Sequence, residues 1–268
     1  MKKLSYFAVA LTAVAFAACT GNKTQNTQDG TDSVKSFEQE QIEENIKVQM
    51  DSLAAEFGKL KSVPIIKTED DGKIELTDEE KQVKPDYLLA PSVAENAVTL
   101  AEKYRALSAL AVDKEVAKLY DMPTDEYDEA ITKLATDIND PSFKVLDGAD
   151  NVFEASGALY EAMNENSRIN YFWQLASTSI VEQLFVTTQK TDKFITAFDD
   201  DAVSNITFRV ALLQDAIQRL SEYDPEIKPV AEAIKPLAVL NAISVDEFKS
   251  QLEEAKEEIA KSRNALLK

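Results

Sequence analysis

Residues 169–189, INYFWQLASTSIVEQLFVTTQ, contain one charged residue, Glu182, in a chain of which 29% is charged. On a helical wheel of about 100° per residue, the apolar side chains of this stretch fall on every side. A helix that is apolar all round is normally buried all round. We therefore expect this stretch, here called the hub, to be the central helix of a bundle.

The distribution of glycine and proline favours an all-α fold. After residue 58 only Gly72, Gly148 and Gly157 occur, and no proline interrupts residues 142–224. Sheet proteins need such turn residues frequently, so their scarcity indicates helices. A short β-hairpin near residues 65–76 is the one exception that the pattern leaves open.

Periodic apolar residues and capping signals predict a multi-helix bundle of about eight helices, formed by a single domain over residues 34–268. The first helix is expected over about 34–61. A capping box from Ser92 to Glu95 is expected to open a later helix. Asp199, Asp200 and Asp201 are expected to cap another at its N-terminus, and Pro236 to break the helix in which it lies.

The N-terminus resembles a bacterial lipoprotein signal peptide. A basic start and an apolar run over residues 7–18 end in Phe16-Ala17-Ala18-Cys19, and this ending resembles a lipobox. The resemblance implies that residues 1–18 are removed and that Cys19 is acylated and becomes the mature N-terminus. Phe16 stands where the lipobox usually has Leu. An ordinary secretory signal that happens to end beside Cys19 is the alternative.

The segment after the cysteine predicts a flexible tether, residues 19–33 with Cys19 included. No apolar residue occurs from Thr20 to Ser33, so the segment cannot bury enough surface to become ordered. Its reach is about 20 Å, which keeps the folded part near its membrane. Because Thr20 is not an Asp, the lipobox resemblance implies the outer membrane of a Gram-negative cell, on its periplasmic or surface face. Ser33 and Ser52 lie in three-residue matches to an O-glycosylation sequon, for which chance is the default explanation.

The charge of the chain excludes two kinds of partner. The chain has a formal net charge of −19 and no basic cluster, so its charge has the wrong sign for binding nucleic acid or the surface of anionic lipids. We therefore expect the membrane to be reached through the acyl anchor at Cys19, and any further partner to be a protein of the envelope.

The composition also limits which catalytic and metal-binding sites the chain can form. The chain has no histidine, and Cys19 is its only cysteine, which removes Ser-His-Asp and Cys-His catalysis and histidine-bound metals. No phosphate-binding or dinucleotide-binding glycine motif is present. The sequence therefore predicts a protein that is not an enzyme, with no catalytic residue, cofactor or metal. A calcium loop over Lys67 to Asp78 is disfavoured, because Pro64 removes its incoming helix.

Four hub residues form the candidate ligand site. Tyr171, Trp173 and Phe185 would line a pocket between helices, and Glu182 would give it specificity. The competing interpretation is that the aromatic rings fill the core and the polar groups bond between helices, because aromatic stripes at helical spacing are usually core.

Glu182 itself needs an explanation, because a buried carboxylate must pair with a cation, take up a proton or reach water. Arg168 and Arg209 are the candidate partners. The favoured function is a non-catalytic interaction or structural module. A carrier of a small apolar or amphipathic ligand is the alternative, and a carboxylate-based hydrolase is a remote third that would require buried carboxylates to converge.

Overall fold

The computed structural model describes residues 37–59, 74–146 and 156–268. The chain divides after Asn45 into two units, and the second, Ile46–Lys268, contains the hub. The described residues form eleven α-helices and three 3-10 helices and contain no strand, which confirms the all-α bundle. No helix among them is both long and apolar enough to cross a membrane.

The described elements are all helices. In chain order they are α1 (Phe37–Lys59), α2 (Asp78–Gln82), α3 (Val93–Asn96), α4 (Leu100–Leu119), α5 (Asp125–Ile138), η1 (Pro141–Leu146), α6 (Ser156–Glu165), α7 (Ile169–Gln189), α8 (Thr191–Phe194), η2 (Ile195–Ala197), α9 (Asp200–Ser221), α10 (Lys228–Ile234), η3 (Lys235–Val239) and α11 (Val245–Leu266). The number exceeds the eight expected because helices of one or two turns carry too little periodicity to be recognised in a sequence.

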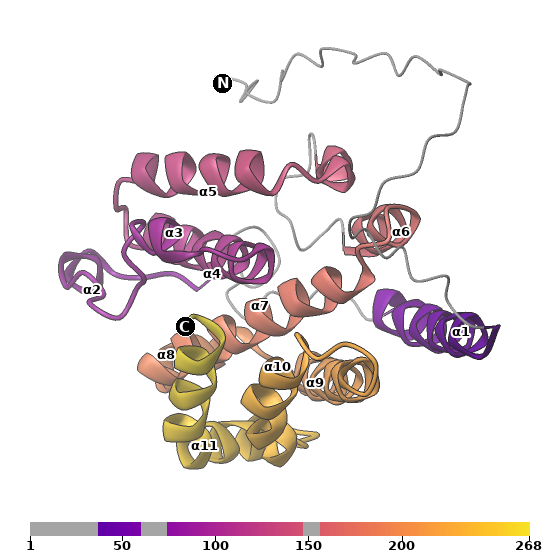
Figure 1. Ribbon diagram of the computed structural model, residues 1–268. Coiled ribbons are helices and arrows are strands. Elements are labelled where there is room, and N and C mark those ends of the chain that lie inside the picture. Colours follow the sequence, from indigo (N-terminus) through magenta and orange to yellow (C-terminus); the bar gives the residue numbers. More distant parts are fainter. Residues whose placement is uncertain (1–36, 60–73, 147–155) are drawn as a thin grey trace. The chain divides into compact units, whose positions relative to one another are not determined.

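The hub is α7, with the bounds that the sequence predicts. It contacts α4 on one side and α9, α10 and α11 on the other, and α6 packs near its N-terminus. Figure 1 shows this order, with α5 on the far side of α4, and α4 between α5 and α7. Most hub residues are buried, polar ones included, as expected for an encircled helix.

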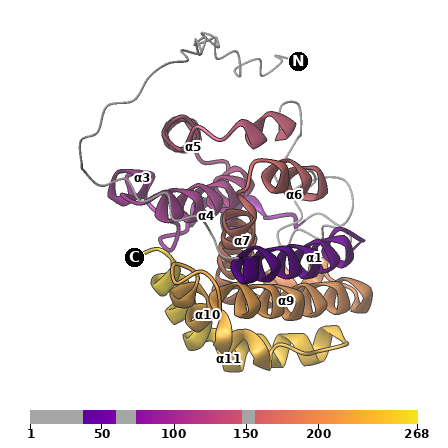
Figure 2. The ribbon, with the colours of Figure 1, turned by 45° about the vertical axis from the view of Figure 1, so that its right-hand side comes forward.

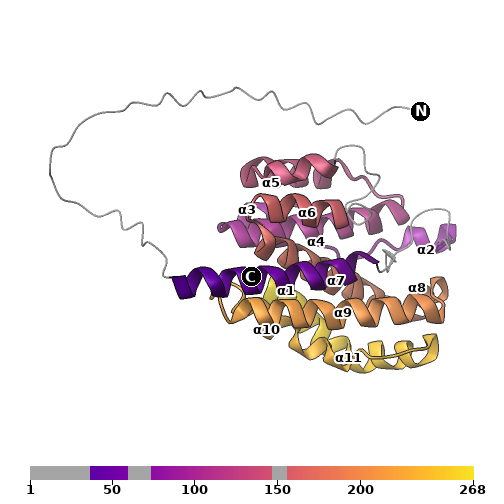
Figure 3. The same cartoon turned by 90° about the vertical axis from the view of Figure 1, so that its right-hand side faces the viewer.

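Part of α1 lies along α9, as Figures 2 and 3 show from two directions. Arg219 of α9 donates a hydrogen bond of 3.0 Å to the side-chain oxygen of Gln49. The Arg209 guanidinium stacks at 4.3 Å over the ring of Phe57, which is buried. From Ile46 onward the helix buries one face, which carries Met50, Ala54 and Phe57.

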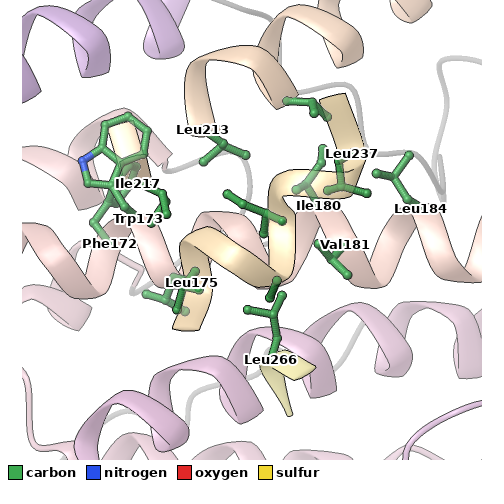
Figure 4. Packing of buried hydrophobic residues seen from close by; sticks show 14 of the residues in the cluster. Phe172, Trp173, Leu175, Ile180, Val181, Leu184, Leu213, Ile217, Leu237 and Leu266 are labelled. Carbon is green, nitrogen blue, oxygen red and sulfur yellow. The ribbon is translucent and has the colours of Figure 1, made fainter. Parts of the chain in front are cut away.

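Buried side chains of the hub pack against those of three later elements. Figure 4 shows α7 residues packing against α9, η3 and α11 in one continuous cluster. The labelled members are Phe172, Trp173, Leu175, Ile180, Val181, Leu184, Leu213, Ile217, Leu237 and Leu266. A second, smaller cluster joins Ile74 and Leu76 to α4 and the end of α7.

One helix start differs from the prediction. Ser92 makes no side-chain cap bond, and only the one-turn helix α3 follows it. The long helix starts at Thr99, whose hydroxyl oxygen accepts from the Glu102 amide at 3.2 Å. The Glu102 carboxylate in turn accepts from the amides of Thr99 and Val98, each at 2.8 Å. The box at Thr99 satisfies three amides, and this explains why the longer helix begins there.

The expected cap of α9 is made by Asp199, which accepts from the Ala202 amide at 2.7 Å, while Asp200 and Asp201 lie in the first turn. The Asp200 carboxylate instead accepts from the Val245 amide at 2.8 Å, at the start of α11. At Pro236 the α-helix gives way to the 3-10 helix η3. The hairpin near residues 65–76 has no strand in its described part, residues 74–76, and the rest lies outside the described residues.

Candidate functional site

Three charged side chains from three helices meet in the interior. Asp113 of α4, Glu182 of α7 and Arg263 of α11 are 0%, 1% and 9% exposed, respectively. We call them the buried triad. Each lies on the buried face of its helix, because Asp113 follows Leu110 by three residues and Arg263 follows Ile259 by four.

Arg263 forms a two-pronged ion pair with Glu182. Its Nε donates to both Glu182 carboxylate oxygens, at 2.9 and 2.8 Å, and its Nη2 lies 2.7 Å from Oε1. The guanidinium also stacks on the Phe185 ring at 4.0 Å. This planar arrangement holds the arginine in one orientation and gives the hub glutamate its counter-ion.

Asp113 contacts the same guanidinium at a longer distance. Its Oδ2 lies 3.7 Å from Arg263 Nη2 and accepts a 2.7 Å hydrogen bond from the Leu89 amide. Its Oδ1 is buried and has no donor within reach among the described residues. The carboxyl groups of Asp113 and Glu182 share one nitrogen of the guanidinium, because Arg263 Nη2 also lies 2.7 Å from Glu182 Oε1. One arginine thus faces two carboxyl groups.

The triad also fixes the segment before α3. Arg263 Nη2 donates to the backbone oxygen of Tyr87 at 3.1 Å, and the Tyr127 hydroxyl donates to the backbone oxygen of Leu89 at 2.8 Å. Polar groups of this segment, α4, α5, α7 and α11 therefore belong to one network. Such a network positions elements that are distant in the sequence.

Burial shifts the titration of both carboxyl groups upward. Burial raises the pKa of Asp113 well above its ordinary value and the Glu182 charge raises it further, while the Leu89 amide and Arg263 oppose the shift. Burial also raises the pKa of Glu182, while Arg263 and, less strongly, Asp113 oppose the rise. The same burial raises the pKa of Tyr127 to about 12.

The converging carboxyl groups have a cation against them and are closed to solvent. Glycosidase chemistry needs room for a sugar or a water between two carboxyl groups. Asp113 and Glu182 both contact Arg263 Nη2, and both are almost fully removed from solvent. The arrangement therefore holds an ion pair and a second carboxyl group out of water.

The structure separates the four predicted ligand-site residues. Glu182 and Phe185 both contact Arg263, whereas Trp173 lies nine residues earlier, about 14 Å along the helix axis. Tyr171 is half-buried and stacks on the Tyr104 ring with centroids 4.7 Å apart. The two pairs therefore do not line one common pocket.

Trp173 is surrounded by aromatic rings. Phe57, Tyr160 and Phe172 pack edge-on against it, with centroid distances of 5.6, 6.2 and 5.3 Å. Its indole nitrogen is buried with no hydrogen-bond partner among the described residues, and the same holds for Gln174 Nε2 and Ser177 Oγ. Three unsatisfied donors thus lie within one turn of the hub.

The predicted partners of Glu182 were wrong. Arg168 lies over the Tyr171 ring at 5.6 Å and Arg209 over Phe57 at 4.3 Å, and the counter-ion is Arg263. A sequence signal for Arg263 did exist, because it falls on the apolar stripe of its helix. Asp113 gives the same signal on α4, where a helix-interior acid lies among apolar residues.

No group of three or more acidic or cysteine side chains in the described ranges could hold a metal ion. Cys19 and Ser33 lie outside those ranges; Ser52 is an exposed residue of α1. Comparison of the chain with protein families, with curated proteins and with solved structures finds no match.

Proposed function

We propose that the chain is a lipid-anchored protein of the bacterial cell envelope that acts by binding or assembly and not by catalysis. The acyl anchor at Cys19 would hold it to the outer membrane, and a protein of the envelope would be its partner. The proposal combines the lipobox resemblance with the character of the bundle interior.

The observation that carries the non-catalytic part is the pairing of Glu182 with Arg263. The hub glutamate was the residue best placed to act on a ligand or a substrate, and the fold uses it internally. With this group committed to packing, the outer surface becomes the favoured place for function.

Anchoring is tested by replacing the cysteine. We expect Cys19→Ala to lose incorporation of labelled palmitate and to leave the membrane fraction of a Gram-negative host. Thr20→Ala, which keeps the lipobox cysteine, should retain both. Equal labelling of Cys19→Ala and the unaltered chain would contradict the anchor.

Surface binding is tested by photo-crosslinking in living cells. Ile243 and Phe208 are large apolar side chains that are 72% and 47% exposed, and charge-poor positions of this kind form interface centres. A photoreactive residue at either position should give a discrete adduct of higher mass. The exposed acidic position Glu257 on α11 serves as the control. Identical adduct patterns at all three positions, or no adduct at any, would count against an interaction surface.

A carrier remains the second candidate, favoured by the unsatisfied donors of Trp173, Gln174 and Ser177. Buried donors without partners call for an acceptor, supplied by a ligand or by an ordered water. Native mass spectrometry of the full chain, purified in mild detergent without denaturant, distinguishes the two. A retained small molecule that is lost in Gln174→Leu would support the carrier; a mass equal to that of the acylated chain alone would exclude it.

A further inference from the structure

The buried triad has one positive and two potentially negative groups. If both carboxyl groups were ionised, two carboxylates would face one guanidinium and the interior would hold an uncompensated negative charge. Such a charge is costly in a site from which water is excluded. A single bound proton removes it.

Of the two carboxyl groups, Asp113 is the better site for this proton. Glu182 accepts three short contacts from Arg263, whereas Asp113 has only one distant contact to that guanidinium, at 3.7 Å. Asp113 Oδ1 also lacks any donor among the described residues. The ion pair therefore selects Glu182 as the charged member.

We propose that Asp113 carries a proton in the folded protein, so that the triad is neutral and its three helices are tied together most strongly in mild acid. The fold then contains a built-in proton site whose occupancy controls stability. This inference does not depend on the proposed function.

The groups that face the triad do not compensate for a lost proton. Tyr87 lies in the segment before α3, and Tyr127 lies in α5. Burial raises the pKa of both phenols, so they stay uncharged around neutral pH. Phe185 of α7, on whose ring the Arg263 guanidinium stacks, is apolar. Arg263 is therefore the one cation that the described neighbours supply to the triad.

The sign of the pH dependence follows from the proton count. In the unfolded chain Asp113 loses its proton near its ordinary pKa of 3.8, whereas burial keeps the proton bound to higher pH in the folded chain. The contribution to stability is complete below that ordinary value and is lost as pH rises through the folded-state pKa. Through this window the equilibrium constant for unfolding rises up to about tenfold per pH unit.

Asp113→Asn tests the proposal, because the amide keeps the shape and cannot ionise. The full chain in detergent is unfolded by urea between about pH 4 and pH 9, with emission of the single tryptophan, Trp173, as the probe. The ratio of the unfolding constants, unaltered chain over variant, should rise with pH by up to about tenfold per unit and then level off.

Glu257→Gln on the exposed face of α11 is the control for loss of one negative charge. Its ratio should stay within about twofold across the same range. A constant ratio for Asp113→Asn, or one that falls with pH, would overturn the proposal.

A direct measurement covers the case in which the variant does not fold. The infrared spectrum of the unaltered chain at neutral pH should show the carbonyl band of a protonated, buried carboxylic acid, which resists deuterium exchange. Absence of that band would show that Asp113 is not protonated in the folded protein. Where the variant folds, the band should disappear in Asp113→Asn and persist in Glu257→Gln.

Discussion

At the scale of single residues, Arg263 matters because it is the cation that pairs with the buried Glu182. The glutamate is 1% exposed and takes three contacts from this one guanidinium. Removing one member of a buried pair leaves the other charge unpaired in a poorly polarisable interior, and this costs far more than the pair itself is worth.

We expect Arg263→Met to lower the free energy of unfolding by about 3–5 kcal/mol at neutral pH. Methionine keeps much of the side-chain volume, so the loss reports on charge more than on packing. Urea unfolding followed by Trp173 emission measures it.

Arg219→Met is the matched control. Arg219 pairs with Asp215 at 2.9 Å on the helix surface, with both side chains more than 40% exposed. Its removal should cost less than about 1 kcal/mol. Equal losses for the two arginines would show that the interior pair has no special weight.

The sequence showed that Glu182 needs a partner but not which one. Its isolation among apolar residues is a local pattern, which can be recognised in the amino-acid sequence alone. Its counter-ion lies 81 residues away, and such a pairing depends on how α7 and α11 pack. The four predicted ligand-site residues separated for a related reason: shared membership of one helix does not place side chains on one side of it.

At the scale of elements, the start of α4 shows where sequence signals compete. Both Ser92–Glu95 and Thr99–Glu102 fit the capping-box pattern, and only the second makes the reciprocal bonds. Hub bounds, the break at Pro236 and the Asp199 cap were predictable because each depends on residues within one or two turns. The choice between two adjacent boxes depends on what the intervening residues pack against.

We expect Thr99→Ala to destabilise the protein by about 1 kcal/mol, since the α4 N-terminus loses the hydroxyl that caps it. Ser92→Ala should change stability by less than about 0.5 kcal/mol, because the Ser92 side chain caps nothing. Thermal unfolding of both variants, compared with the unaltered chain, checks the pair. The reverse order of effects would place the functional helix start at Ser92.

At the scale of the whole unit, the hub contacts helices from both halves of the chain. α4 and α6 precede it in the sequence, and α9, α10 and α11 follow it. An unfolding event that exposes the hub therefore breaks packing on both sides at once, and the residues from Ile46 onward should behave cooperatively.

Two probes test this cooperativity. Trp173 emission reports on the hub, because that ring is fully buried, and far-ultraviolet circular dichroism reports on all helices together. We expect their urea transitions to coincide within error. A circular dichroism transition that begins well before the change in Trp173 emission would show that outer helices unfold independently.

The chain order of the triad has a consequence for folding. Asp113 and Glu182 are synthesised before α11, the helix that carries their cation. Until that helix arrives, the hub contains a carboxylate without its cation and cannot be closed off from water. The pairing also spans a long loop, so its closure is entropically expensive and slow. A nascent or truncated chain without α11 would thus stay open and accessible to proteases, and the last helix becomes the step that commits the unit to its final form.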